Sequence, residues 1–211
     1  MKCYTIGYSD RKLEEFLELL RLYNIDCIMD IRNNPYSSNN SRVYDKEILE
    51  KQIKQCGINY MYMGNQLSVQ KIHDELKKKG KSINFYNALE DNIFNKGINK
   101  IVTGIKRGHK IALMCEEKNP FNCSRGIVIG YALKKVGINL QHIISDIIWK
   151  TQERIEEEIY VTYEPFFQDK FVKATIQDMV EEDDYDKVNF NDIKKRVIEA
   201  GYIKKFKEIR N

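Results

Sequence analysis

KIALMCEEKNPFNCSRG, residues 110–126, contains the pattern that decides the fold. Its first six residues form a short apolar run, which is typical of a strand buried on both faces of a sheet. Similar runs recur at 3–9, 27–32, 58–63 and 139–145, and helical patterns separate them. This alternation predicts a doubly wound α/β fold: a mostly parallel sheet of about five strands with helices on both faces.

The pattern changes after residue 150, and the charge changes with it. Residues 1–150 carry 24 Lys and Arg against 16 Asp and Glu, a net charge of +8, whereas residues 151–211 carry 11 against 15, a net charge of −4. We therefore predict an α/β domain over 1–150 and a mainly helical C-terminal extension over 151–211 that packs on it. The basic domain suits an anionic small molecule or nucleic acid, although its lysines also simply solubilise helix faces.

Several classes of protein are disfavoured by the composition. No apolar run approaches the length that spans a bilayer, and the first residues lack the apolar core of a signal peptide, so we expect a cytoplasmic protein that binds no membrane. Five cysteines at irregular spacings do not resemble a secreted disulfide framework. Reduced thiols are the expectation.

Polar side chains gather where the predicted strands end. In open parallel sheets, ligands bind beyond the carboxyl ends of the strands, so these residues are the candidate site. Along the chain they are Tyr8 and Ser9, Asp30 and Arg32, Cys115 and Glu117, and His142. An arginine, two acids and a thiol at one edge exceed what solubility requires. We expect Asp30, Cys115 and His142 to lie at one edge of the sheet.

Asp30 and Arg32 lie two residues apart on a predicted strand and therefore face the same side. They suit an acid and a guanidinium that grip a ligand, and Ser37 follows in a loop that can close over a bound group. The alternative is an internal ion pair at the sheet edge, which is at least as common.

Ser124 and Arg125 begin the predicted helix at 124–136, and Cys123 lies directly before it. If Ser124 caps this helix, the first backbone N–H groups and Arg125 form an anion site, and the helix dipole favours a Cys123 thiolate. The alternative is that Cys115 and Cys123 are small buried apolar side chains at a strand-to-helix turn.

Well-known catalytic motifs are absent from the sequence. A thiol phosphatase needs an arginine six positions after its cysteine, and position 121 is Phe. No P-loop, Rossmann glycine motif or nucleophile elbow occurs. Two cysteines separated by seven residues, with three scattered histidines, are too few for a closed zinc site, so no metal site is predicted. The sequence assigns no cofactor.

The chain resembles the family called domain of unknown function 488. The matching pieces are TIGYS, IDCIMDIRNNPYS, GINYMYMGNQL, IALMCEEKNPFNCSR and GINLQHI, in family order over roughly residues 4–146. The resemblance implies the motif positions Asp30, Arg32, Pro35, Ser37, Cys115, Glu117, Pro120, Cys123 and Arg125. Ser124 stands where the family carries histidine. The resemblance implies an α/β fold and supplies no reaction.

Three hypotheses about function follow. The first is an enzyme acting on a phosphorylated, nucleotide or nucleic-acid substrate. Its catalytic candidates are Asp30, Glu117, Cys123 and Cys115, and its ligand-binding candidates are Tyr8, Ser9, Arg32, Ser37, Ser124 and Arg125. The second is a non-catalytic nucleotide- or nucleic-acid-binding module. The third is an adaptor that recruits a protein partner through its C-terminal tail.

Overall fold

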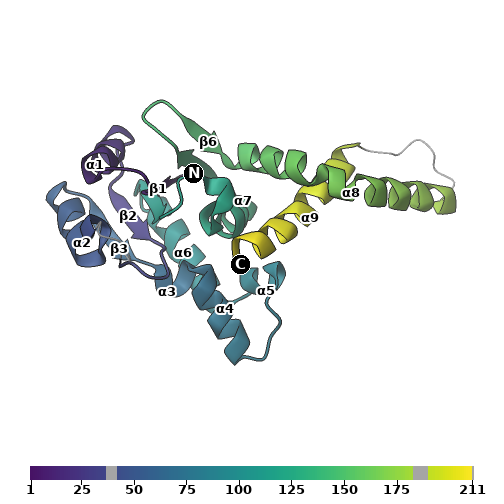
Figure 1. The fold of residues 1–211 in the computed structure, drawn as a ribbon, viewed down its shortest axis with the longest axis horizontal. Helices are drawn as coiled ribbons and strands as arrows, with labels where there is room; N and C mark the ends of the chain where they lie inside the picture. Colours follow the sequence, from purple (N-terminus) through teal and green to yellow (C-terminus); the bar gives the residue numbers. More distant parts are fainter. Residues whose placement is uncertain (37–41, 183–189, 211) are drawn as a thin grey trace.

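The chain folds around one six-stranded sheet in the computed structural model, which describes residues 1–36, 42–182 and 190–210 (Figure 1). The strands are β1 (Lys2–Gly7), β2 (Cys27–Asp30), β3 (Asn59–Tyr62), β4 (Ile111–Cys115), β5 (Asn139–Ile143) and β6 (Trp149–Thr151). Their order is β3-β2-β4-β1-β5-β6, and only the β5–β6 pair is antiparallel. All five predicted strands are confirmed.

Helices follow every described strand except β5. They are α1 (Leu13–Leu22), α2 (Lys46–Gln55), α3 (Gly64–Leu67), α4 (Val69–Lys78), α5 (Phe85–Leu89), α6 (Asn92–Lys106), α7 (Gly130–Lys135), α8 (Gln152–Glu182) and α9 (Phe190–Arg210). Two 3-10 turns, Arg42–Tyr44 and Pro120–Asn122, and a π-helical turn, Arg125–Ile129, complete the described elements.

The sheet is covered on both faces, which confirms the doubly wound prediction. Strand β4 shows why its sequence is a continuous apolar run. Ile111 and Leu113 pack into a core with α6 and α7, whereas Ala112 and Met114 pack into a second core with α1 and α2. All five residues of β4 are buried, because each face of the strand meets helices.

The sixth strand was not predicted. β6 pairs with β5 through a turn in which the backbone N–H groups of Ile144 and Ser145 donate to the carbonyl of Ile148. It is only three residues long and Trp149 is half-exposed. A strand this short at a sheet edge carries too few buried positions for a periodic pattern.

The C-terminal extension is helical, as predicted, and its two helices lie side by side (Figure 1). Ile155 and Ile159 of α8 and Tyr202 and Phe206 of α9 join the same core as α5 and α7. The domain boundary at residue 150 stays a prediction. Among the described residues, no helix is both long enough and apolar enough to cross a membrane.

Candidate functional site

The ends of β1, β2 and β4 lie beside one another at one edge of the sheet. The pairing register places Asp30 opposite Met114, and Gly7 opposite Cys115. Asp30 and Cys115 therefore share this edge, as predicted, because neighbouring parallel strands end together. His142 lies opposite Thr5, two positions before the end of β1, so it is buried inside the sheet and not at this edge. Two separate groups of polar side chains form here: an acid–guanidinium cluster (Tyr8, Asp30, Arg32, Tyr44 and Tyr60) and a thiol cluster (Cys115, Glu117, Cys123 and Arg125).

The acid–guanidinium cluster is centred on the buried pair Asp30 and Arg32. Arg32 Nη2 donates to Asp30 Oδ2 at 2.6 Å, and Arg32 Nε donates to Oδ1 at 2.9 Å. The Tyr60 hydroxyl donates to Oδ2 at 2.6 Å, and Arg32 Nη1 donates to the carbonyl of Tyr44 at 2.8 Å. Every oxygen of the Asp30 carboxylate thus has a donor, which a buried charge requires.

Two aromatic rings pack beside the Arg32 guanidinium. The Tyr8 and Tyr44 rings stack with centroids 4.3 Å apart, and the Arg32 guanidinium carbon lies 5.2 Å from the Tyr8 centroid. Burial, followed by the charge of Asp30, raises the pKa of Tyr60, so its hydroxyl keeps the proton that it donates. The geometry matches the internal ion pair that the sequence left as one of two alternatives.

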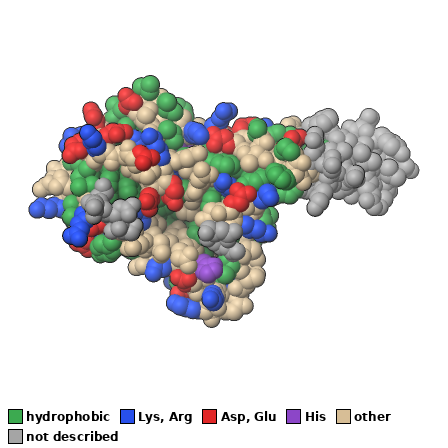
Figure 2. Space-filling view, in the orientation of Figure 1, with side chains coloured by type: hydrophobic (Ala, Val, Ile, Leu, Met, Phe, Trp, Pro, Cys, Tyr) green, Lys and Arg blue, Asp and Glu red, His purple; other side chains and the backbone are tan. Residues whose placement is uncertain are grey.

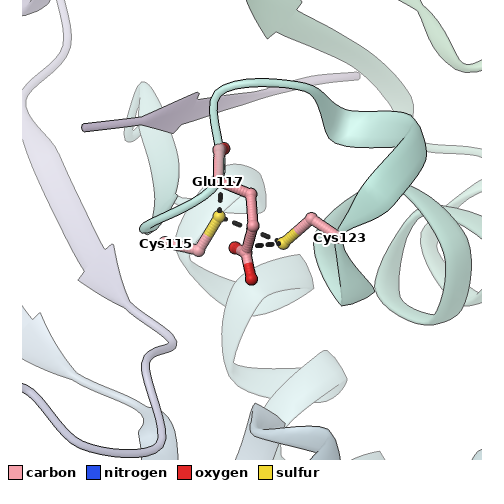
Figure 3. Close-up of side chains that lie close together, drawn as sticks. All are labelled: Cys115, Glu117 and Cys123. Carbon is pink, nitrogen blue, oxygen red and sulfur yellow. Dashed lines mark hydrogen bonds between the residues drawn. The ribbon is translucent and has the colours of Figure 1, made fainter. Parts of the chain in front are cut away.

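The thiol cluster lies at the end of the adjacent strand β4 (Figure 3). The sulfur atoms of Cys115 and Cys123 are 3.1 Å apart, and Cys123 Sγ donates to Glu117 Oε2 at 3.0 Å. One ligand atom from each of these three residues lies within 4.8 Å of the other two. Both cysteines are buried, whereas Glu117 is exposed.

Two glycines allow the loop around the cluster to pack tightly. A Cβ at Gly7 would overlap the carbonyl of Glu117, and a Cβ at Gly126 would overlap the carbonyl of Pro120. The loop that carries Glu117 therefore lies directly on the end of β1, and the turn before Cys123 lies on the start of the next helix. These close approaches fix the backbone on either side of the two thiols.

Arg125 anchors the same loop from inside the protein. Its side chain is fully buried; Nη1 donates to Cys115 Sγ and to the carbonyl of Glu117, and Nη2 donates to the carbonyl of Lys118 at 2.9 Å. Within the described part of the chain, its guanidinium has no hydrogen bond to a carboxylate. Burial raises the pKa of Cys115 and the Arg125 charge opposes that effect.

A chain of buried polar groups continues from Arg125 to the C-terminal helices. Arg125 Nε donates to Thr5 Oγ1 at 3.1 Å, and Thr5 contacts His142 Nδ1 at 2.8 Å. On the far side, His142 Nε2 lies 3.0 Å from Gln152 Oε1, and Gln152 Nε2 donates to the Tyr202 hydroxyl at 2.9 Å.

The donors and acceptors of this chain have only one consistent arrangement. Because Gln152 Oε1 can only accept, His142 carries its proton on Nε2, and Nδ1 accepts from the Thr5 hydroxyl. Burial, with the nearby Arg125 charge, lowers the pKa of His142 to about 3. His142 is therefore a neutral link between the thiol cluster and α8, and no sequence motif indicates that Thr5 and Gln152 are its partners or that Tyr202 bonds to Gln152.

The remaining predicted site residues are placed as follows. Ser9 lies at the edge through its backbone, whose N–H donates to the carbonyl of Glu116 at 2.9 Å. Ser37 lies outside the described residues. The predicted helix cap by Ser124 is wrong, because its own backbone is already helical and its side chain makes no capping hydrogen bond. Ligand contacts by Ser124 and Arg125 stay predictions.

The family model of the domain of unknown function DUF488 matches residues 12–132, more than half of the chain. The chain therefore belongs to this family, and the resemblance seen in its motifs is confirmed. The matched region contains the Asp30–Arg32 pair and the thiol cluster, and leaves α8 and α9 outside. No curated protein and no solved structure matches the chain.

Proposed function

We propose that this member of the DUF488 family is an enzyme that uses a thiol nucleophile on a phosphorylated, nucleotide or nucleic-acid substrate. Cys123 is the nucleophile and Glu117 is the base that accepts its proton. The observation that carries the proposal is the 3.0 Å hydrogen bond from Cys123 Sγ to Glu117 Oε2. A nucleophile within hydrogen-bond reach of a base is the arrangement that covalent catalysis requires.

Glu117 fits the role of the base better than Asp30 does. Asp30 is fully buried, and both of its oxygens accept hydrogen bonds from Arg32. Glu117 is exposed, so a proton that it accepts can pass to solvent or to a leaving group. Of the two cysteines, Cys123 contacts the carboxylate directly, whereas the thiol of Cys115 is held between Arg125 and Cys123.

The substrate class is supported by charge. Residues 1–150 carry a net charge of +8, which attracts anions to this part of the molecule. Lys118 is exposed next to Glu117, and Arg125 binds its carbonyl, so the position of this lysine's backbone is fixed. An anionic group bound by Lys118 would therefore lie at the loop that carries the proposed base.

Turnover of model substrates tests the proposal. p-Nitrophenyl phosphate, bis(p-nitrophenyl) phosphate and ATP represent phosphate monoesters, diesters and nucleotides. We expect wild type to act on at least one of them and Cys123→Ser to fall to background. Glu117→Gln should lose a factor of about 100 or more. The matched controls are Cys27→Ser, a buried cysteine on β2, and Glu116→Gln, the exposed neighbouring carboxylate.

Two outcomes would change the assignment. Full turnover by Cys123→Ser would make the thiol structural and would remove the nucleophile. Binding of ATP measured by calorimetry, with no turnover by any variant, would favour the alternative of a non-catalytic nucleotide- or nucleic-acid-binding module.

A further inference from the structure

We propose that Cys115, Glu117 and Cys123 form a binding site for a single divalent cation of the zinc class. The three residues come from two different segments, the end of β4 and the start of the following helical region, and their side chains point toward one another (Figure 3). Their ligand atoms all lie within 4.8 Å of one another. This inference goes beyond the proposed reaction and does not depend on it.

The donor set selects the kind of ion. Two soft sulfur ligands beside one hard carboxylate oxygen favour Zn²⁺ over Mg²⁺ or Ca²⁺, because those ions prefer oxygen alone and Zn²⁺ accepts both kinds of ligand. The sequence argued against a closed zinc site because two cysteines are too few. Folding adds a third ligand, since the loop that Gly7 and Arg125 hold in place returns Glu117 to the two thiols.

The charges balance when a divalent ion is bound. Two thiolates and one carboxylate carry −3, and a divalent cation together with Arg125 carries +3. The Arg125 guanidinium is fully buried, and within the described residues it contacts Cys115 and oxygen atoms that carry no formal charge. Without an ion, the nearby Glu117 carboxylate offsets this charge without a hydrogen bond to it, and metal-bound thiolates would place negative charge directly against the guanidinium.

Arg125 also has the position of an outer-shell partner. Its Nη1 donates to Cys115 Sγ, so this hydrogen bond already orients the sulfur that would ligate the ion. The sulfur atoms lie 3.1 Å apart. A tetrahedral ion with Zn–S distances of about 2.3 Å would hold them about 3.8 Å apart, so the thiols must separate slightly on binding.

Three protein ligands leave one tetrahedral position for water or an anion, which is the pattern of an open zinc site. Glu117 is the exposed member, so the cluster meets solvent on its side. A cation in this site would be coordinated by the sulfur of Cys123, which would then not be free to attack a substrate. Metal binding and the free Cys123 nucleophile of the proposed function therefore exclude each other at any one moment.

Cobalt titration of the full-length, metal-stripped protein tests the inference. Co²⁺ bound by thiolates gives a sulfur-to-metal charge-transfer band. Added Zn²⁺ should displace the Co²⁺ and remove the band. We expect one Co²⁺ per chain for wild type and loss of the band in Cys115→Ser and Cys123→Ser. Glu117→Gln should bind at least about tenfold more weakly, since loss of an outer-shell partner alone has this effect. Cys27→Ser and Glu116→Gln should bind like wild type.

The inference is overturned if wild type gives no thiolate band, or if the band survives in both Cys115→Ser and Cys123→Ser. Circular dichroism establishes that each variant is folded. Should either serine variant fail to fold, Glu117→Gln decides the question, because its exposed side chain is dispensable for packing. Unchanged Co²⁺ affinity in Glu117→Gln would then refute the three-residue site.

Alkylation separates the failure of this inference from failure of the proposed function. Zn²⁺ should slow the reaction of Cys123 with iodoacetamide, detected by mass spectrometry, if the metal site exists. A thiolate band together with full turnover by Cys123→Ser would leave the metal site standing and refute the nucleophile. Loss of turnover in Cys123→Ser without any Co²⁺ band would do the reverse.

Discussion

The acid–guanidinium cluster and the thiol cluster lie at the ends of neighbouring strands, yet they are built in opposite ways. In the first, a buried carboxylate faces a buried guanidinium, and donors reach both oxygens. In the second, a buried guanidinium faces a sulfur atom, and the carboxylate of Glu117 is exposed. In the first cluster the two charged groups bond directly to each other, whereas in the second each of them bonds to a thiol.

Because of this difference, we expect different roles for residues that belong to the same family motif. A satisfied ion pair stabilises or orients the fold and has little left to offer a ligand. Crowded thiols beside a carboxylate and a buried guanidinium can react, or can lose their protons and bind a metal ion. We therefore expect substitutions in the first cluster to change mainly stability, and those at the exposed end of the second to change mainly chemistry.

The largest expected effect is that of Arg32→Ala. The change leaves the Asp30 carboxylate buried without its counter-charge, so the free energy of unfolding should fall by about 3–5 kcal/mol. Urea denaturation measures the loss, and Arg107→Ala, an exposed arginine, should stay within about 0.5 kcal/mol of wild type. A stable Arg32→Ala protein that loses affinity for phosphate or ATP would break the comparison, because Arg32 would then be a ligand-binding residue.

The next effect is that of Gln152→Leu, which cuts the polar chain between the thiol cluster and the C-terminal helices. Gln152 accepts from His142 and donates to Tyr202 and to the carbonyl of Gly126, all within the core. Removing it takes away the acceptor of His142 and this donor to Gly126, at a cost of about 2 kcal/mol or more, whereas the Tyr202 hydroxyl keeps its bond to Glu156.

Urea denaturation measures this loss, with Gln70→Leu on the surface of α4 as the control. Stability equal to wild type would mean that α8 contributes packing without completing the polar network.

A smaller effect concerns pH and His142. Its pKa is lowered to about 3 in the folded protein, whereas the unfolded chain titrates at about 6.5. Below pH 6.5 the unfolded state binds a proton that the folded state does not, so His142 lowers stability as the pH falls from 6.5 toward 3. The slope approaches about 1.4 kcal/mol per pH unit.

Denaturation midpoints between pH 7 and 5 test this. His142→Gln should flatten the acid loss, and His109→Gln, on an exposed histidine, should not. Parallel pH profiles for wild type and His142→Gln would show that another group governs the acid loss.

The fold was predictable because its signal is local. A strand buried on both faces, such as β4, reads as a continuous apolar run, and helices between such strands follow from their periodicity. The site was only partly predictable. Position along the chain placed Asp30, Arg32 and Cys115 at one edge, but whether Arg32 meets Asp30 or a ligand depends on side-chain geometry. Gln152 reaches His142 across 10 residues of chain and Tyr202 reaches Gln152 across 50, and no local pattern encodes such contacts.

The smallest expected effect on stability is that of Glu117→Gln, and it separates the two clusters most sharply. Glu117 is exposed, and the loop is held through its backbone carbonyl, which the substitution retains. The free energy of unfolding should therefore change by no more than about 0.5 kcal/mol. The amide cannot accept the Cys123 proton as a carboxylate does, so alkylation of Cys123 by iodoacetamide should slow by about tenfold or more.

Glu116→Gln is the matched control for both measurements, because this neighbouring carboxylate is equally exposed. A large loss of stability in Glu117→Gln would mean that its side chain supports the loop, and the thiol cluster would then be structural, like its neighbour. Unchanged stability together with unchanged alkylation would mean that the 3.0 Å contact does not activate the thiol. Only unchanged stability with slowed alkylation keeps the contrast between a completed ion pair and a reactive thiol at adjacent strand ends.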